Sequence, residues 1–322
     1  MFKSLFVLGA FLFTTQLYAV TLKFGVLAPE GTNWAKQMKK MAKEVKKATD
    51  GKVKYKIYFG GSQGDEHDVL RKIRVGQLHG GMFTGKTLGD INGDVRVVEL
   101  PFTFLHDRAK AWSTVEKMSG FFNKGFVKNE FVNLGFSELG LVYFVSQKET
   151  PNIKSLNGVK IWSWEGDKLV SSMIEEMKLV SVPLPLPDVL SSLSTGIIEA
   201  AYAPPLGIVS LQWNTKIKYL VDFPIAYSVG AFLVSNKGWK KVPAKYQEVV
   251  KKISEKYIAK VSEANISDNE AALESMKQLG VKFSKFPDSD IATGKDLREK
   301  IVKKLEGKLF SSEALKILKT HL

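Results

Sequence analysis

Apolar and polar positions alternate regularly near the start of the chain. Segments 22–26 and 53–57 carry an apolar side chain at every second position, which is the period of a β-strand. Between them, apolar residues recur at spacings of three and four over 34–48, which predicts a helix with one apolar face. Thr32 or Asn33 is suited to cap that helix. The first three elements are therefore expected to be a strand, a helix and a strand.

The same alternation of strands and helices continues along the chain. After a glycine-rich loop, the pattern predicts a helix over 65–75 and a strand over 78–83. Pro187 and Gly196 mark the start and the end of a short helix. Strands are also predicted at 141–145, 160–162 and 231–234, and helices at 167–177 and from Pro243 onward. Alternating elements of this kind predict an α/β fold with a mainly parallel sheet that helices cover on both faces.

The length of the chain indicates two lobes. With 322 residues, it is longer than a single hydrophobic core usually serves. A second unit is expected to start near Leu141, where a new apolar run begins. The sequence has no internal repeat and no low-complexity linker between the units. Several chain crossings, rather than one tether, are therefore expected to join the lobes.

The first residues have the charge, apolar and small-residue order of a secretory signal peptide. Lys3 supplies the positive charge, 5–13 is apolar, and 17–19 (Leu-Tyr-Ala) is a suitable cleavage site. A transmembrane anchor needs about 20 apolar residues, roughly twice this run. We therefore expect residues 1–19 to be a signal peptide and the mature protein to begin at Val20; a buried N-terminal helix is the alternative.

Composition narrows the class of protein further. The absence of cysteine excludes disulfides, thiolate zinc sites and a lipid anchor on cysteine. The net charge of +14 comes from 47 basic residues, of which only five are Arg, the type preferred for phosphate and base recognition. These charges are spread along the chain and mixed with acids. They indicate a solvated surface rather than a nucleic-acid partner, although attraction to an anionic membrane or a permease stays open.

One segment matches a nucleotide-binding motif. Residues 80–87 (GGMFTGKT) fit the P-loop pattern, whose backbone amides and Lys hold phosphates. In a P-loop protein, however, the motif begins after the strand ends. Here the strand predicted over 78–83 would occupy the first half of the motif. Nucleoside triphosphate is also not expected outside the cytoplasm. A glycine-flanked loop is the preferred interpretation.

The remaining chemistry favours recognition over catalysis. The four His residues, 67, 79, 106 and 321, include no pair at the i, i+4 spacing of a helical zinc site. No G-x-S-x-G segment and no evident carboxylate pair occur. We therefore predict no catalytic residue, no metal and no cofactor, and we do not expect an enzyme, although groups distant in sequence could still combine.

Aromatic residues are the more informative signal. Phe144, Trp162, Trp164, Tyr202 and Trp213 come from segments that should border the second lobe. Scattered aromatic residues usually belong to the core. Trp162 and Trp164, however, are two positions apart at a predicted strand end and should point to the same side. A role in stacking against a ligand is therefore expected for this pair.

At this level of detail the chain resembles the periplasmic solute-binding proteins of tripartite ATP-independent periplasmic (TRAP) transporters, the DctP type. The likeness covers nearly all of the mature chain, and it rests on the order and spacing of several segments. These are 22–26 with the turn and helix after it, 58–65 (YFGGSQGD) with 76–78, 156–161 (LNGVKI), 187–190 (PDVL) with 196–199 (GIIE), and 235–243 (SNKGWKKVP).

This resemblance implies a two-lobed periplasmic binding protein fold with a hinge. A long C-terminal helix from about Pro243 would brace both lobes, and the lobes would close on a small organic ligand in the cleft between them. We assign 20–141 with 229–268 to lobe I, and 142–228 with 269–322 to lobe II. The implied partner is an integral membrane permease, a small and a large subunit driven by an ion gradient.

The chain departs from the family where the ligand is expected to bind. Members of the family usually carry an Arg in the strand after the Asn-Gly-x-Lys segment, and it holds an organic acid through a two-pronged salt bridge. Trp162 stands at that position here. Gly85 and several apolar residues align with cleft positions that are often polar. Because a buried carboxylate without a charged partner is costly, dicarboxylates and sialic acid are disfavoured.

A hydrophobic, aromatic or cationic ligand, packed by Trp162 and Phe144, is therefore expected. Lys86 could still rescue a weak acid. The predicted ligand-binding residues are Trp162, Phe144, Trp164, Leu186, Ala203, Leu27, Asp65, Lys86 and Trp213. One alternative is the same fold serving a resistance–nodulation–division (RND) type permease for apolar compounds. An enzyme and a pure sensor module are less favoured alternatives.

Overall fold

The computed structural model describes residues 19–322. The predicted signal peptide therefore lies outside the described residues, apart from Ala19. Within them, no helix is both long enough and apolar enough to cross a membrane. The strands are β1 (Val20–Gly25), β2 (Val53–Tyr58), β3 (Gly80–Thr84), β4 (Phe131–Ser146), β5 (Lys160–Ser163), β6 (Val180–Pro183), β7 (Ala200–Ala203), β8 (Tyr219–Val221), β9 (Ala226–Ser235) and β10 (Lys282–Ser284).

Helices alternate with the strands along most of the chain. The α-helices are α1 (Asn33–Ala48), α2 (Glu66–Arg74), α3 (Gly85–Ile91), α4 (Arg108–Lys128), α5 (Lys168–Glu176), α6 (Val189–Thr195), α7 (Pro205–Ser210), α8 (Asn236–Trp239), α9 (Ala244–Gln278), α10 (Ser289–Leu305) and α11 (Ser312–Lys319). Short 3₁₀ turns are η1 (Gly93–Glu99), η2 (Ile153–Leu156), η3 (Leu186–Asp188) and η4 (Trp213–Thr215).

Local sequence signals place several helix ends where they were predicted. The Thr32 hydroxyl accepts a hydrogen bond from the Ala35 amide and caps α1. Gly196 ends α6 with a left-handed φ of 75°, a conformation that costs glycine little. Helix α9 begins directly after Pro243 and is 35 residues long. The long helix predicted from that position is thereby confirmed.

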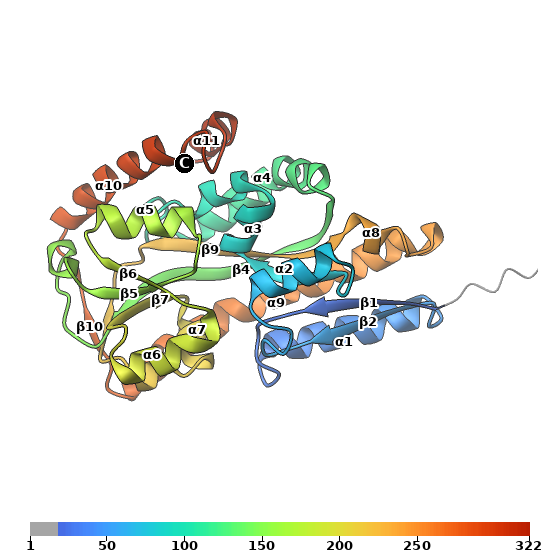
Figure 1. Ribbon diagram of the computed structural model, residues 1–322, viewed down its shortest axis with the longest axis horizontal. Coiled ribbons are helices and arrows are strands. Elements are labelled where there is room, and N and C mark those ends of the chain that lie inside the picture. The colour runs from blue at the N-terminus through green and yellow to red at the C-terminus, as the bar shows by residue number, and fades with distance from the viewer. Residues whose placement is uncertain (1–18) are drawn as a thin grey trace, which may run out of the picture.

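The sheet is mixed rather than mainly parallel. Its strand order is β2-β1-β3-β9-β4-β7-β5-β6, and β8 joins β4 to β10. The two long strands β4 and β9 are antiparallel to each other and lie at the centre. Figure 1 shows both running along the long axis of the molecule, with β1 and β2 at one end and β5 to β7 at the other. These central strands and α9, which contacts α1, β4 and α7, join the two lobes.

Strand β4 is much longer than predicted. The apolar run predicted over 141–145 is only the last part of a strand that begins at Phe131, and two irregularities interrupt its pairing with β9. They lie between Asn133 and Phe136 and between Glu138 and Gly140. Gly140 has a φ of +117° and approaches the Asn269 side chain closely, so a side chain there would be strained. Bulges of this kind bend a strand, and here they lie where β4 passes from one lobe to the other.

Lobe I is the half built around β1, β2 and β3, and lobe II is the half built around β5, β6 and β7. The exact residue bounds of the lobes stay a prediction. Helix α10 packs against α5 of lobe II, whereas α11 contacts η1 and α4. The last segment of the chain therefore runs from lobe II to η1 and α4.

Candidate functional site

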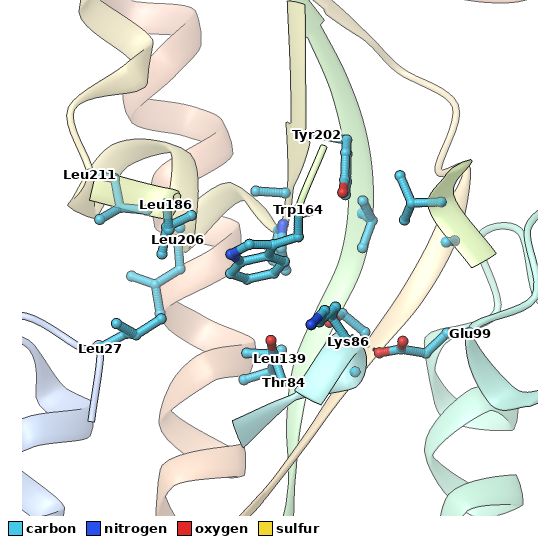
Figure 2. Close-up of a pocket in the computed structure, with 18 of the residues that line it drawn as sticks. Leu27, Thr84, Lys86, Glu99, Leu139, Trp164, Leu186, Tyr202, Leu206 and Leu211 are labelled. Carbon is cyan, nitrogen blue, oxygen red and sulfur yellow. Dashed lines mark hydrogen bonds between the residues drawn. The ribbon is translucent and has the colours of Figure 1, made fainter. Parts of the chain in front are cut away.

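A cavity of about 210 Å³ lies between the two lobes, and its wall is mostly apolar. Lobe I contributes Leu27, Thr84 and Lys86, and lobe II contributes Trp164 and Leu206 among others. Figure 2 shows the Trp164 indole in the middle, between a group of leucines on one side and the Lys86 and Glu99 side chains on the other. The cavity therefore has one apolar end and one charged end.

Most of the predicted ligand-binding residues come together at this cavity, although they are far apart in the sequence. Those that line it are Leu27, Lys86, Trp162, Trp164, Leu186, Ala203 and Trp213, together with Gly85. That they contact a ligand stays a prediction. The signal for Trp162 and Trp164 was their placement at a strand end. Leu27, Leu186 and Ala203 were predicted from the family resemblance.

Trp162 and Trp164 do point to the same side: their ring centroids lie 5.0 Å apart in an edge-to-face arrangement, within a cluster of aromatic rings. The Trp162 ring lies 5.1 Å from the Tyr202 ring at an interplanar angle of 23°, and 5.4 Å from the Trp213 ring. Its Nε1 donates a hydrogen bond of 2.9 Å to the Leu184 carbonyl oxygen. Trp162 is only 2 % exposed. Trp164 is half-buried, so its ring is the more available surface for a ligand.

The placement of Phe144 at the cavity wall needs correction. Phe144 is 1 % exposed, belongs to the same core cluster as Leu169 and Met173 of α5, and does not line the cavity. Val142, on the same face of β4, does line it. Two residues further along the strand, the protein's own apolar packing covers that face. Phe144 therefore stabilises lobe II rather than facing a ligand.

Asp65 connects the lobes without lining the cavity. Its Oδ1 accepts a hydrogen bond from the Glu66 amide at 2.7 Å and caps α2. Its Oδ2 accepts from the Trp164 indole Nε1 at 2.9 Å and from the Leu186 amide at 3.4 Å. The sequence prediction put Asp65 among the ligand-binding residues. In this geometry it holds the Trp164 ring in place from the opposite lobe.

Lys86 lies at the charged end of the cavity but is not a P-loop lysine. Its ammonium forms an ion pair of 2.7 Å with Asp90, one turn further along α3. Strand β3 occupies residues 80–84 of the motif, and α3 starts directly at Gly85. No phosphate-binding loop therefore separates strand and helix in this part of the described chain, which agrees with the preferred interpretation of the motif.

A buried ion network at the same end was not predicted from the sequence. Arg96 is 4 % exposed, and its Nε lies 3.1 Å from Glu99 Oε2. Its Nη2 lies 3.1 and 3.2 Å from the two carboxylate oxygens of Asp167. All three residues line the cavity. The only hint in the sequence was the presence of Arg96 and Glu99 inside the apolar run 95–102.

Burial and charge act in opposite directions within this network. Burial disfavours the charged guanidinium, but the Asp167 and Glu99 carboxylates outweigh that effect and raise the pKa of Arg96. Burial raises the pKa of Glu99, and the Arg96 charge partly offsets the rise. Asp167 also accepts hydrogen bonds from the Leu169 and Val170 amides and caps α5. Asp167 thus links the start of a lobe II helix to the guanidinium of η1.

Glu66 is a second buried carboxylate on the cavity wall. It is 3 % exposed, and both of its oxygens accept from the Thr84 amide at 3.0 Å. Burial is the main reason that its pKa rises to about 8, and the hydrogen bond from the Thr84 amide limits the rise. Glu66 therefore holds a proton in the folded protein at neutral pH.

This raised pKa predicts a pH-dependent contribution to stability. From pH 4.5 to about 8 the folded state keeps a proton on Glu66 that the unfolded chain has lost, so the contribution falls as pH rises. The slope would be about 1.4 kcal/mol per pH unit. We expect Glu66→Gln, which cannot ionise, to become progressively more stable than the wild type across this window. Thermal denaturation at several pH values measures this, and a constant difference would contradict it.

A mixed α/β chain whose two lobes enclose one largely apolar cavity has the architecture of a solute-binding protein. The comparison with known families agrees. The family model of bacterial extracellular solute-binding protein family 7 (DctP) matches residues 24–308. The chain therefore belongs to this family, which consists of transport proteins that act outside the cytoplasm, and the resemblance to the TRAP type is confirmed.

Individual relatives are distant in sequence but similar in fold. A solute-binding protein of Verminephrobacter eiseniae is 21% identical over 263 residues, which cover 80% of this chain and 76% of the relative. The 2,3-diketo-L-gulonate-binding periplasmic protein YiaO of Escherichia coli is 21% identical over 313 residues, 93% of both chains. A TRAP periplasmic solute-binding protein from Desulfovibrio salexigens, crystallised with bound orotic acid, is 21% identical, with a TM-score of 0.84 over 94% of this chain and 98% of that one. That Trp162 replaces the family's ligand-binding Arg stays a prediction.

Proposed function

We propose that this protein is the periplasmic solute-binding subunit of a TRAP-type transporter and captures an apolar or aromatic solute, not a dicarboxylate. The solute would bind between the lobes, and the loaded protein would deliver it to a membrane permease. Export through the predicted signal peptide, cleaved before Val20, is part of this proposal.

The character of the cavity wall supports this ligand class. Relatives include a protein crystallised with bound orotic acid and a protein named for binding 2,3-diketo-L-gulonate, and both of these ligands are acids. In this chain, apolar side chains, with several leucines and tryptophans among them, form most of the wall, and the two cations in it, Lys86 and Arg96, already pair with carboxylates. A ligand with two carboxylates would find no free cation to offset its desolvation.

Trp164 provides the direct test. We expect Trp164→Ala to weaken binding of an apolar aromatic solute by about tenfold or more, because the variant loses one aromatic face and the contact that Asp65 holds in place. Native mass spectrometry of protein purified without refolding identifies a co-purified ligand. Tryptophan fluorescence with a screen of apolar and aromatic compounds then gives affinities for the wild type and the variant.

A matched control is Trp112→Ala. Trp112 lies on α4, is also half-buried, and does not line the cavity. This variant should keep the wild-type affinity. Tight binding of succinate, or equal affinities for wild type and Trp164→Ala, would contradict the proposal.

The same apolar wall is compatible with the alternative partner, an RND-type permease for hydrophobic compounds. The two possibilities differ in the permease and not in the cavity. The type of permease gene that lies next to the gene of this protein distinguishes them.

A further inference from the structure

The charged groups on the cavity wall already balance one another. Among the described residues that line the cavity, the cations are Lys86 and Arg96, and the carboxylates are Glu66, Glu99 and Asp167. Asp90 pairs with Lys86 at 2.7 Å. Glu66 holds a proton at neutral pH, so two carboxylates and two cations remain on the wall, and each cation has a partner from the chain itself.

Asp167 and Glu99 hold Arg96 in different ways. Glu99 lies three residues after Arg96 in η1 and also accepts a hydrogen bond from the Val229 amide at 3.0 Å. Asp167 instead comes from the start of α5, 71 residues away, and presents both carboxylate oxygens to Nη2. Both oxygens share one nitrogen, so this is not the two-nitrogen fork in which Arg usually holds an organic acid, but Asp167 takes up charge and a donor of Arg96 that a ligand carboxylate would need.

We propose that Asp167 is a specificity-determining residue: it neutralises the Arg96 guanidinium and occupies its Nη2, and so excludes carboxylate ligands in favour of neutral or cationic ones. This inference rests on the proposed function, because it concerns the same cavity. A carboxylate that enters the cavity meets a guanidinium already paired on two of its nitrogens, and it comes close to the negative charges of Asp167 and Glu99. An amide meets no such electrostatic penalty.

The substitution Asp167→Asn tests this with little change in shape. Asparagine is as good a helix cap as aspartate, so the start of α5 should persist. Arg96 keeps Glu99 as a counter-ion, so the guanidinium is not left buried without a charge partner. What the variant loses is the negative charge that competes with a ligand.

Three probes of similar size and different charge measure the effect: benzoate, benzamide and benzylamine. By titration calorimetry at neutral pH, we expect the wild type to bind benzamide and benzylamine, and benzoate about tenfold more weakly or worse. In Asp167→Asn, benzoate should gain about tenfold in affinity, whereas benzamide should change by less than about twofold.

A matched control is Asp107→Asn. Asp107 caps α4 in the same way, through a hydrogen bond from the Lys110 amide, and does not line the cavity. This variant should keep the wild-type order of the three probes. If Asp167→Asn does not fold, Asp167→Ser removes the same charge and retains a capping hydroxyl.

The outcomes separate the two proposals. If the wild type binds none of the three probes, the proposed apolar and aromatic ligand class is wrong. If it binds benzoate as tightly as benzamide, or if the folded Asp167 variant leaves the affinity for benzoate unchanged, the role of Asp167 is wrong and the proposed function stands.

Discussion

Substitution of Arg96 by methionine is expected to lower the free energy of unfolding by about 3–5 kcal/mol. Methionine fills much of the same volume, but it leaves the carboxylates of Glu99 and Asp167 buried without a cation. Leaving a charge uncompensated in the interior costs far more than the net stabilisation that an ion pair provides. Urea denaturation followed by circular dichroism measures the loss.

The pH dependence of this variant has a definite sign. Without Arg96, the pKa of Glu99, which burial already raises, would rise further. The folded variant would then bind a proton that the unfolded chain lacks at neutral pH. Its deficit in stability should therefore shrink as the pH falls toward 4.5, the ordinary value for a glutamate.

Two further variants test the explanation. Arg71→Met removes an Arg from an exposed pair of similar length, 3.0 Å to Asp68, and should cost about 0–1 kcal/mol. The triple variant Arg96→Met, Glu99→Gln, Asp167→Asn also lacks the two buried carboxylates that have no cation in Arg96→Met. It should therefore regain part of the stability that the single variant loses. If Arg96→Met and Arg71→Met were equally destabilising, the buried network would not be important for stability.

Trp162→Ala should also destabilise the protein by about 3–5 kcal/mol. Trp162 is among the largest fully enclosed side chains, and its removal leaves a cavity bordered by the Tyr202 and Trp213 rings. The variant also loses the hydrogen bond from the indole to the Leu184 carbonyl. Because the neighbouring rings belong to different elements, they are not expected to collapse into the space. Thermal and urea denaturation give the value.

Trp162→Phe separates packing from hydrogen bonding. Phenylalanine can keep a ring against Tyr202 but cannot donate to Leu184, so an intermediate loss is expected. Trp112→Ala, at a half-buried position on α4, should cost less than Trp162→Ala. Equal losses for these two alanine variants would show that the stack around Trp162 contributes no more than ordinary surface packing.

Some features of the site could be predicted because they depend on short stretches of chain. The Trp162 and Trp164 side chains share a side because alternate residues of an extended segment do so. Lys86, Leu27 and Leu186 were correctly placed near one another, since the resemblance to a known family supplied the order of elements. Phe144 was misplaced because the point along β4 at which the protein's own core replaces the cavity depends on tertiary packing, which no local pattern reveals.

The ends of α1, the start of α9, the α/β class and the family followed from the sequence alone, because caps, apolar periods and the order of segments are local or additive signals. The irregular pairing of β4 with β9 and the network of Arg96, Glu99 and Asp167 became evident only in the tertiary structure. The Arg96–Asp167 contact joins residues 71 positions apart. Its existence depends on how two lobes meet, and a residue's own neighbours in the chain carry no information about that.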